Sequence, residues 1–162
     1  MGFFALGLIT GIPLEKSVSY SLCKRGCEGS GRLFWLPVVN GLIYMGMYVR
    51  AEGQRQSLLS ALSFCLCTSL LLAVGIIDWK TREIPWGYNL LIGVLGAART
   101  LCHLEQWQEH AAGFFAVSGL LYLFFLLSEG KGIGGGDVKL MAAAGLFLGW
   151  EKALWAFLWG GT

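Results

Sequence analysis

Residues 57–78 read SLLSALSFCLCTSLLLAVGIID, a run with no charged side chain before the aspartate that ends it. A helix needs about 20 consecutive apolar residues to cross the roughly 30 Å hydrocarbon core of a bilayer. This stretch reaches that length, and Asp78 stands where it meets a short polar segment. The only other aspartate in the sequence, Asp137, also stands where a polar segment meets an apolar run.

The whole chain has the composition of a membrane protein. Its 162 residues are 56% hydrophobic and only 14% charged, and the mean hydropathy is +0.63, outside the range of ordinary soluble domains. We therefore predict an all-α, polytopic transmembrane bundle of six or seven helices, which forms a single domain over residues 1–162. The further apolar stretches are residues 2–13, 33–49, 84–98, 111–128, 138–150 and 153–162.

Two segments near the ends of the sequence complete this plan. The longest polar stretch, residues 14–32, is too short to fold as a soluble domain, and we expect it to follow a retained first helix. The apolar run at residues 153–162 stops abruptly. This leaves two interpretations, a last helix that ends early or a truncated chain.

Lysine and arginine are unevenly divided among the predicted loops. If successive loops alternate sides of the membrane, loops one, three and five hold more of these residues than loops two, four and six. The positive-inside rule then places both aspartates at the cytoplasmic face and the N-terminus outside. The net charge of +2, without a dense basic run, argues against a nucleic acid partner.

The first aspartate belongs to the stretch GIIDWKTREIP at residues 75–85. Proline fixes its own φ and disfavours helix at the residue before it, so we predict that Pro85 is the first residue of a new helix. Asp78 is then left at the cytoplasmic end of the preceding helix. The alternative is an interfacial acid without a catalytic role, paired with Lys80 or Arg82.

The second aspartate follows a glycine-rich segment, GKGIGGGDVKL at residues 130–140. Each glycine costs roughly 1 kcal/mol relative to alanine inside a helix, so we expect a loose or tightly turned backbone before Asp137 and a helix from Val138 onward. Glycine also lets an extended substrate approach a carboxylate closely. One alternative is a flexible loop with Asp137 as helix N-cap. A dinucleotide-binding G-x-G-x-x-G motif would use Gly130, Gly132 and Gly135, but a helical run and not a strand precedes it.

Together the two motifs indicate a hydrolytic site. Two carboxylates that share a site hold one proton between them, because like charges repel. The ionised member can activate water, while the protonated member polarises the scissile carbonyl and later protonates the leaving amine. An acid within a membrane costs about 2.5–3.5 kcal/mol on insertion scales, so its presence favours a functional role.

These motifs resemble those of the type IV prepilin peptidases and archaeal preflagellin peptidases, which are G-x-G-D intramembrane aspartyl proteases. The resemblance rests on IDWKTREIP at residues 77–85 and GGGDVKLMAA at residues 134–143. A weaker match is LPVVNGL at residues 36–42, and the resemblance covers roughly residues 33–159.

The resemblance implies that Asp78 and Asp137 form the catalytic dyad. It implies cleavage of the leader peptide of prepilin-like precursors, such as type IV pilins and type II secretion pseudopilins, at the cytoplasmic face of the inner membrane. The lipid bilayer is the other expected partner, and no cofactor is expected. The residues expected to shape the active-site turn or meet the substrate are Gly134, Gly135, Gly136, Lys139, Glu83 and Pro85.

The sequence also departs from the family pattern. Many bacterial members carry two Cys-x-x-Cys pairs between the first two helices, where this chain has only Cys23 and Cys27, spaced Cys-x-x-x-Cys. A structural zinc site needs about four ligands, so we predict no metal site. Because the cysteine pairs of the methylating members are missing, an N-methyltransferase activity is doubtful. Five cysteines, two of them in an apolar run, also argue against a disulfide framework. Trp86 follows Pro85 where the family often has Asn or Asp.

Two other functions stay open. The chain could be a catalytically silent membrane scaffold or assembly factor with the same fold. It could also be a small-solute or ion carrier that uses Asp78 and Asp137 as coupling acids, although no inverted repeat is visible and both acids are predicted at one interface.

Overall fold

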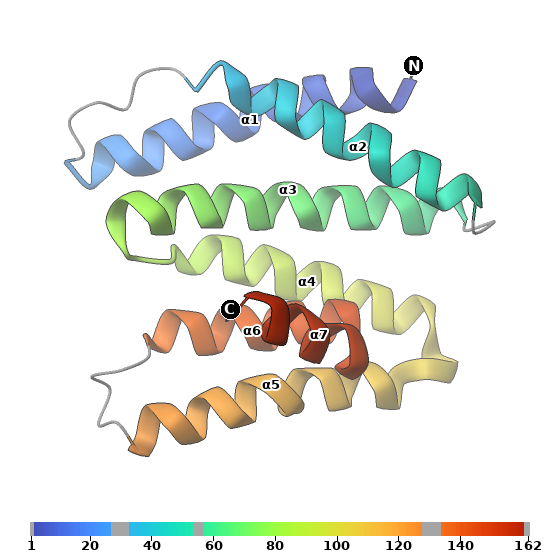
Figure 1. Cartoon of the computed structure of the whole chain (residues 1–162), viewed down its shortest axis with the longest axis vertical. Helices are drawn as coiled ribbons and strands as arrows, with labels where there is room; N and C mark the ends of the chain where they lie inside the picture. Colours follow the sequence, from blue (N-terminus) through green and yellow to red (C-terminus); the bar gives the residue numbers. More distant parts are fainter. Residues whose placement is uncertain (1, 27–32, 54–56, 128–133, 161–162) are drawn as a thin grey trace. The chain divides into compact units, whose positions relative to one another are not determined.

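The computed structural model describes residues 2–26, 33–53, 57–127 and 134–160. Within these ranges every regular element is a helix, which confirms the predicted all-α bundle of six or seven helices (Figure 1). The chain divides between Glu83 and Ile84 into two compact units. The elements are α1 (Gly2–Lys24), α2 (Trp35–Gly53), α3 (Leu58–Thr81), α4 (Trp86–Cys102), the 3-10 helix η1 (Leu104–Gln106), α5 (Trp107–Leu127), α6 (Gly135–Leu148) and α7 (Trp150–Gly160).

In the first unit, α1 and α2 cross at very short range (Figure 1). A Cβ atom added at Gly7 would lie 2.6 Å from the Cα atom of Gly41, and one added at Gly11 would lie 2.6 Å from the Cα atom of Pro37. The two backbones therefore touch. Small residues at helix interfaces allow this kind of contact in membrane bundles.

A buried polar network joins all three helices of this unit. The side-chain amide of Asn40, on α2, donates to the Gly7 carbonyl of α1 at 2.8 Å and to the Thr10 hydroxyl at 3.1 Å. On its other side, the Asn40 carbonyl oxygen accepts from the Ser69 hydroxyl of α3 at 2.6 Å. Tyr44 contributes a hydroxyl 3.3 Å from that of Ser69. Asn40 is fully buried, so these bonds replace the water that it has lost.

Helix α1 is longer than predicted. The sequence predicts a first helix that ends near Pro13 and a polar stretch over residues 14–32, but α1 continues through Pro13 to Lys24. Proline removes one backbone donor from a helix, yet Val18 and Leu22 beyond it are completely buried. Their burial, on the side of the helix that also buries Gly11, stabilises the extra turns. Residues 27–32 lie outside the described ranges.

Helix α3 carries a row of buried residues along its length. Ala61, Cys65, Ser69, Ala73 and Ile77 follow one another at every fourth position, and all are buried. This spacing marks one face of a helix.

Large apolar side chains remain exposed on both units. Examples are Ile9, Leu42, Leu59, Val94, Phe115 and Leu123. Two described helical segments, Leu58–Thr81 and Leu104–Leu127, are long and apolar enough to cross a membrane. An extensive apolar surface of this kind suits lipid better than water. Insertion of the helices into a membrane stays a prediction.

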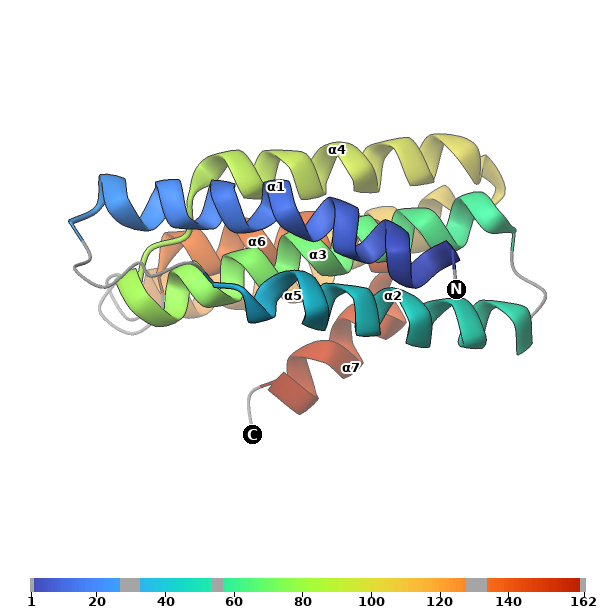
Figure 2. The ribbon, with the colours of Figure 1, turned by 90° about the horizontal axis from the view of Figure 1, so that it is seen from above.

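In the second unit, α6 packs against both α4 and α5, and α7 lies at an angle to α6 (Figure 2). Gly113 on α5 and Gly145 on α6 bring their backbones together, because a Cβ atom at either would collide with the carbonyl oxygen of the other. Gly149 ends α6 with φ of 83°, a value that glycine adopts readily. The buried His110 adds a contact from its Nδ1 to the Leu146 carbonyl at 2.9 Å.

Candidate active site

Asp78 lies in the last turn of α3 and is partly buried. The helix ends at Arg82, which takes a left-handed conformation with φ of 51° and donates its backbone N–H to the Asp78 carbonyl at 2.7 Å. The predicted position of Asp78 at a helix end is therefore confirmed. Its predicted cytoplasmic side stays a prediction.

Lys80 and Arg82 do not neutralise this acid. Both side chains are exposed, and neither forms an ion pair with the Asp78 carboxylate in the described part of the chain. A carboxylate in the last turn of a helix is also opposed by the helix dipole. The interpretation of Asp78 as an acid paired with Lys80 or Arg82 thus has no support in the geometry.

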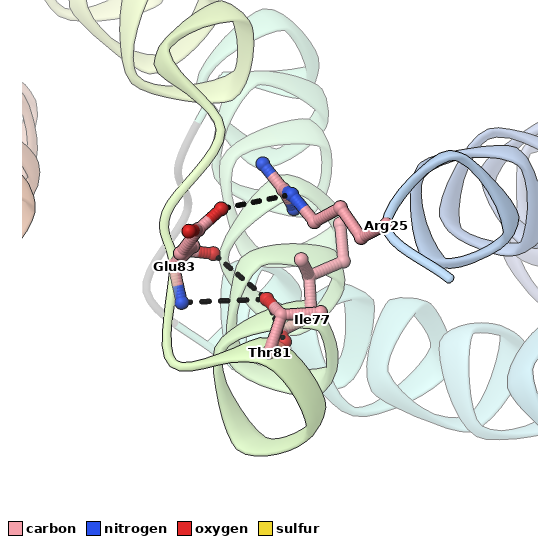
Figure 3. A network of polar contacts seen from close by, with 4 residues as sticks. All are labelled: Arg25, Ile77, Thr81 and Glu83. Atoms are coloured by element: carbon pink, nitrogen blue, oxygen red, sulfur yellow. Dashed lines mark hydrogen bonds and ion pairs between the residues drawn. The ribbon is translucent and has the colours of Figure 1, made fainter. Parts of the chain in front are cut away.

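The segment after α3 is held by a network around Thr81 and Glu83 (Figure 3). The Thr81 hydroxyl lies 2.9 Å from the Ile77 carbonyl and 3.2 Å from the Glu83 carbonyl, and it accepts from the Glu83 N–H at 3.3 Å. The Glu83 carboxylate pairs with Arg25, with 3.2 Å between Oε2 and Nε. Glu83 was predicted to meet substrate, and the structure adds that one of its oxygens already has a partner inside the chain.

Pro85 is the N-cap of α4, with φ of −65° and ψ of 126°, and Trp86 is the first helical residue. The prediction that Pro85 opens the helix was wrong by one position. The extended Ile84 before it packs against the glycine motif, because a Cβ atom at Gly136 would lie 3.3 Å from the Ile84 Cβ atom. Ile84 and Pro85, which end the first motif, therefore lie beside the start of α6.

Asp137 lies in the first turn of α6 and is exposed. Gly134 is the N-cap, and its carbonyl accepts the Asp137 N–H at 3.0 Å. The alternative that Asp137 itself caps the helix is wrong, and so is the prediction of a helix that starts at Val138. Gly135 and Gly136 are already helical because glycine tolerates the first turn, where few backbone N–H groups have an intrahelical partner.

The three glycines before Asp137 have different surroundings. A Cβ atom at Gly134 would lie 3.2 Å from Oδ2 of Asp137, whereas one at Gly135 would meet nothing within 4 Å. Gly136 is limited by Ile84, as described above. Lys139 is exposed on the same helix, and its role in substrate binding stays a prediction, as does that of Gly135.

Two alternatives from the sequence fall partly outside the described residues. Gly130 and Gly132 of the possible dinucleotide motif lie outside these residues, and so does Cys27 of the cysteine pair. Where the chain is described, no strand precedes the glycine motif, so the context of a dinucleotide site is missing there. Cys23 is exposed, and the described residues hold no cluster of three or more His, Cys, Asp or Glu that could bind a metal ion.

The structure thus brings the predicted site residues together in two groups. Asp78 and Glu83 lie in the first unit, while Pro85, the three glycines, Asp137 and Lys139 lie in the second. The pairing of the two carboxylates stays a prediction. Arg25 is a residue that the sequence did not single out, because nothing local to position 25 signals a contact with Glu83.

Comparison with known proteins gives the family of this chain. The profile of the type IV leader peptidase family matches residues 65–162, more than half of the sequence. The chain belongs to the type IV leader peptidase family. Both aspartates of this family member lie within the matched residues, together with Glu83, Pro85 and the glycine motif.

Relatives of this leader peptidase family member carry the name prepilin leader peptidase/N-methyltransferase. The protein from Dickeya chrysanthemi is 35% identical over 57% of this chain and 35% of its own length. That from Burkholderia pseudomallei strain 1026b is 38% identical over 55% of this chain and 30% of its own length. The Bacillus subtilis protein is 27% identical over 95% of this chain and 62% of its own length. The chain thus spans about a third of the first two relatives, and no solved structure matches it.

Proposed function

We propose that this chain is an intramembrane aspartyl endopeptidase that removes the leader peptide from prepilin-like precursors. Membership of the leader peptidase family supports the proposal, because both aspartate motifs lie inside the matched region. The relatives named above carry this activity in their names. The proposal concerns the peptidase half of that name and requires no cofactor.

The observation that carries the proposal is the position of Asp78. Its carboxylate is partly buried, lies in the last turn of α3, and pairs with neither Lys80 nor Arg82. Neither the helix dipole nor a paired cation stabilises a carboxylate at this end of the helix. A position that helix stability does not explain is typical of a functional acid.

In the proposed reaction, Asp78 and Asp137 act as a pair that holds one proton. The ionised carboxylate takes a proton from water as the water oxygen bonds to the scissile carbonyl carbon, while the protonated carboxyl donates a hydrogen bond to the carbonyl oxygen. The tetrahedral intermediate then collapses. Its C–N bond breaks, the amine nitrogen takes a proton from the pair, and a carboxylic acid and a free amine leave.

The membrane supplies the setting for this reaction. We propose that the chain crosses the inner membrane several times and presents both aspartates to the cytoplasm, as the distribution of lysine and arginine indicates. The substrate would then be cut just before its own hydrophobic helix enters the bilayer. The two apolar helical segments Leu58–Thr81 and Leu104–Leu127 support this arrangement.

The test is cleavage of a co-expressed type IV prepilin by the full chain and by Asp78→Ala and Asp137→Ala. We expect each substitution to abolish the mass shift of the processed pilin while the variant stays in the membrane fraction. Glu105→Ala is the matched control, since Glu105 is an exposed acid in η1. Normal processing by either aspartate variant would contradict the proposal and favour a silent scaffold or another activity.

A further inference from the structure

The Arg25–Glu83 ion pair joins the end of α1 to the segment that follows Asp78. Arg25 comes directly after α1, and its Nε atom lies 3.2 Å from Oε2 of Glu83. The arginine side chain is only 25% exposed, while that of Glu83 is 69% exposed. The arginine side chain is therefore mostly covered, whereas that of Glu83 is mostly exposed.

One nitrogen of this guanidinium has no acceptor among the described residues. The NH1 atom of Arg25 is buried and makes no hydrogen bond to that part of the chain. A buried charged donor without a partner is unfavourable, and natural structures rarely keep one without a reason. Arginine presents its donors as a planar fork that suits two oxygen acceptors side by side. Glu83 supplies one acceptor, and the NH1 donor needs a second acceptor beside it.

Hydrogen bonds join Glu83 to the end of α3 that carries Asp78. The Thr81 hydroxyl binds the Glu83 backbone and the Ile77 carbonyl (Figure 3). The Arg82 backbone in turn binds the Asp78 carbonyl. Glu83 is thus tied to the same turn of α3 that carries Asp78, and it holds Arg25 in register with that turn.

We propose that Arg25 positions the substrate. Its NH1 group donates to an oxygen of the bound peptide, either a main-chain carbonyl or a side-chain carboxylate, beside the segment that follows Asp78. Glu83 acts through Arg25, by holding the guanidinium in the orientation that presents NH1. This proposal rests on the proposed peptidase function and adds a residue for substrate binding that lies outside both aspartate motifs.

The test uses the full chain in detergent and a fluorescent synthetic peptide that spans the leader and first helical residues of a type IV prepilin. Both the Kd, from fluorescence anisotropy, and the kcat and KM of cleavage are measured for Arg25→Ala, Arg25→Lys and Glu83→Gln. We expect Arg25→Ala and Arg25→Lys to raise Kd and KM roughly 10- to 100-fold, the worth of one charge-assisted hydrogen bond, with little change in kcat. Lys24→Ala is the matched control, because Lys24 is the adjacent exposed cation, and it should leave Kd unchanged.

Glu83→Gln tests the indirect role. We expect a smaller rise in Kd than for Arg25→Ala, and the double variant should bind no worse than Arg25→Ala alone, since both changes remove one interaction. Additive losses would overturn the proposed order of action. If Arg25→Ala proves poorly folded by circular dichroism, Arg25→Lys and Glu83→Gln carry the test.

Altered peptides separate a direct contact from a change in packing. In one series each acidic residue becomes its amide, and in the other each main-chain amide becomes an ester, whose carbonyl is a weaker acceptor. For the peptide that lacks the true acceptor, wild type and Arg25→Ala should bind equally, and the series in which this occurs identifies the acceptor. An equal loss for Arg25→Ala with every peptide, or no loss with any, would overturn the proposal. Binding without cleavage by wild type would refute the peptidase function but still test Arg25 through Kd, whereas no binding by wild type would refute both.

Discussion

Gly134→Ala should slow the proposed cleavage by displacing the carboxylate of Asp137, which we propose to be catalytic. The added Cβ atom would lie 3.2 Å from Oδ2, closer than such atoms normally approach, so the carboxylate has to move by a few tenths of an ångström. The backbone at Gly134, with φ of −72° and ψ of 137°, suits alanine without strain. The substitution therefore acts on the side chain of Asp137 and not on the fold.

The size of the effect follows from this displacement. A misplacement of about 1 Å in an active site can cost about 10²-fold in rate. For a shift of a few tenths of an ångström we expect kcat to fall roughly tenfold, about 1.4 kcal/mol of barrier. Alanine is a poorer N-cap than glycine, so the substitution should cost up to about 1 kcal/mol of stability and lower the thermal midpoint slightly.

The assay is the initial rate of prepilin peptide cleavage in detergent, with products quantified by mass spectrometry and unfolding followed in parallel. Gly46→Ala is the control, since a Cβ atom there meets nothing within 4 Å and the position is exposed on α2. Gly135→Ala tests whether substrate passes over this open position. If it does, the added methyl group should raise KM and leave kcat normal. An unchanged kcat for Gly134→Ala would refute the idea that Asp137 acts from its present orientation.

Three further substitutions test the packing. Gly145→Ala should destabilise the second unit by more than about 2 kcal/mol, because the methyl group would collide with the Gly113 backbone, whereas Gly119→Ala, in open space on α5, should be neutral or stabilising in thermal unfolding. Asn40→Ala should cost about 1–3 kcal/mol by leaving buried partners on α1 and α3 unpaired, and a wild-type midpoint would contradict the network. Arg82→Gly should raise stability by roughly 1 kcal/mol, since glycine adopts the left-handed conformation found there without strain, and a lower midpoint would show that the arginine side chain contributes to folding.

The parts of the structure that the sequence predicted are those with local causes. Asp78 stands at the end of α3 because Ile84 and Pro85 prevent the helix from running on. The all-α class follows from long apolar runs. Local reasoning failed where distant burial decides, as at α1, which continues beyond Pro13 because Val18 and Leu22 are buried against the rest of the first unit.

Contacts between distant positions could not be predicted from the sequence, because they also depend on how remote segments pack. Arg25 and Glu83 are far apart in the chain, and no local sequence pattern predicts an ion pair between two such distant positions. The early start of α6 at Gly135 was missed because glycine is costly in a helix interior but not in its first turn. The likeness of both aspartate motifs to a known family supplied the proposed catalytic residues, which apolar periodicity alone would not have distinguished from capping acids.

The side-chain amide of Asn40 binds two neighbouring helices. Its nitrogen donates to α1, and its oxygen accepts from α3. If either helix rotated about its axis by the equivalent of one residue, about 100°, the group that binds Asn40 would turn away. The hydrogen bond would then break in an environment with no water to replace it. The first three helices should therefore move as one body. The proposed substrate should not insert between them, because separating these helices would break the hydrogen bonds on both sides of Asn40.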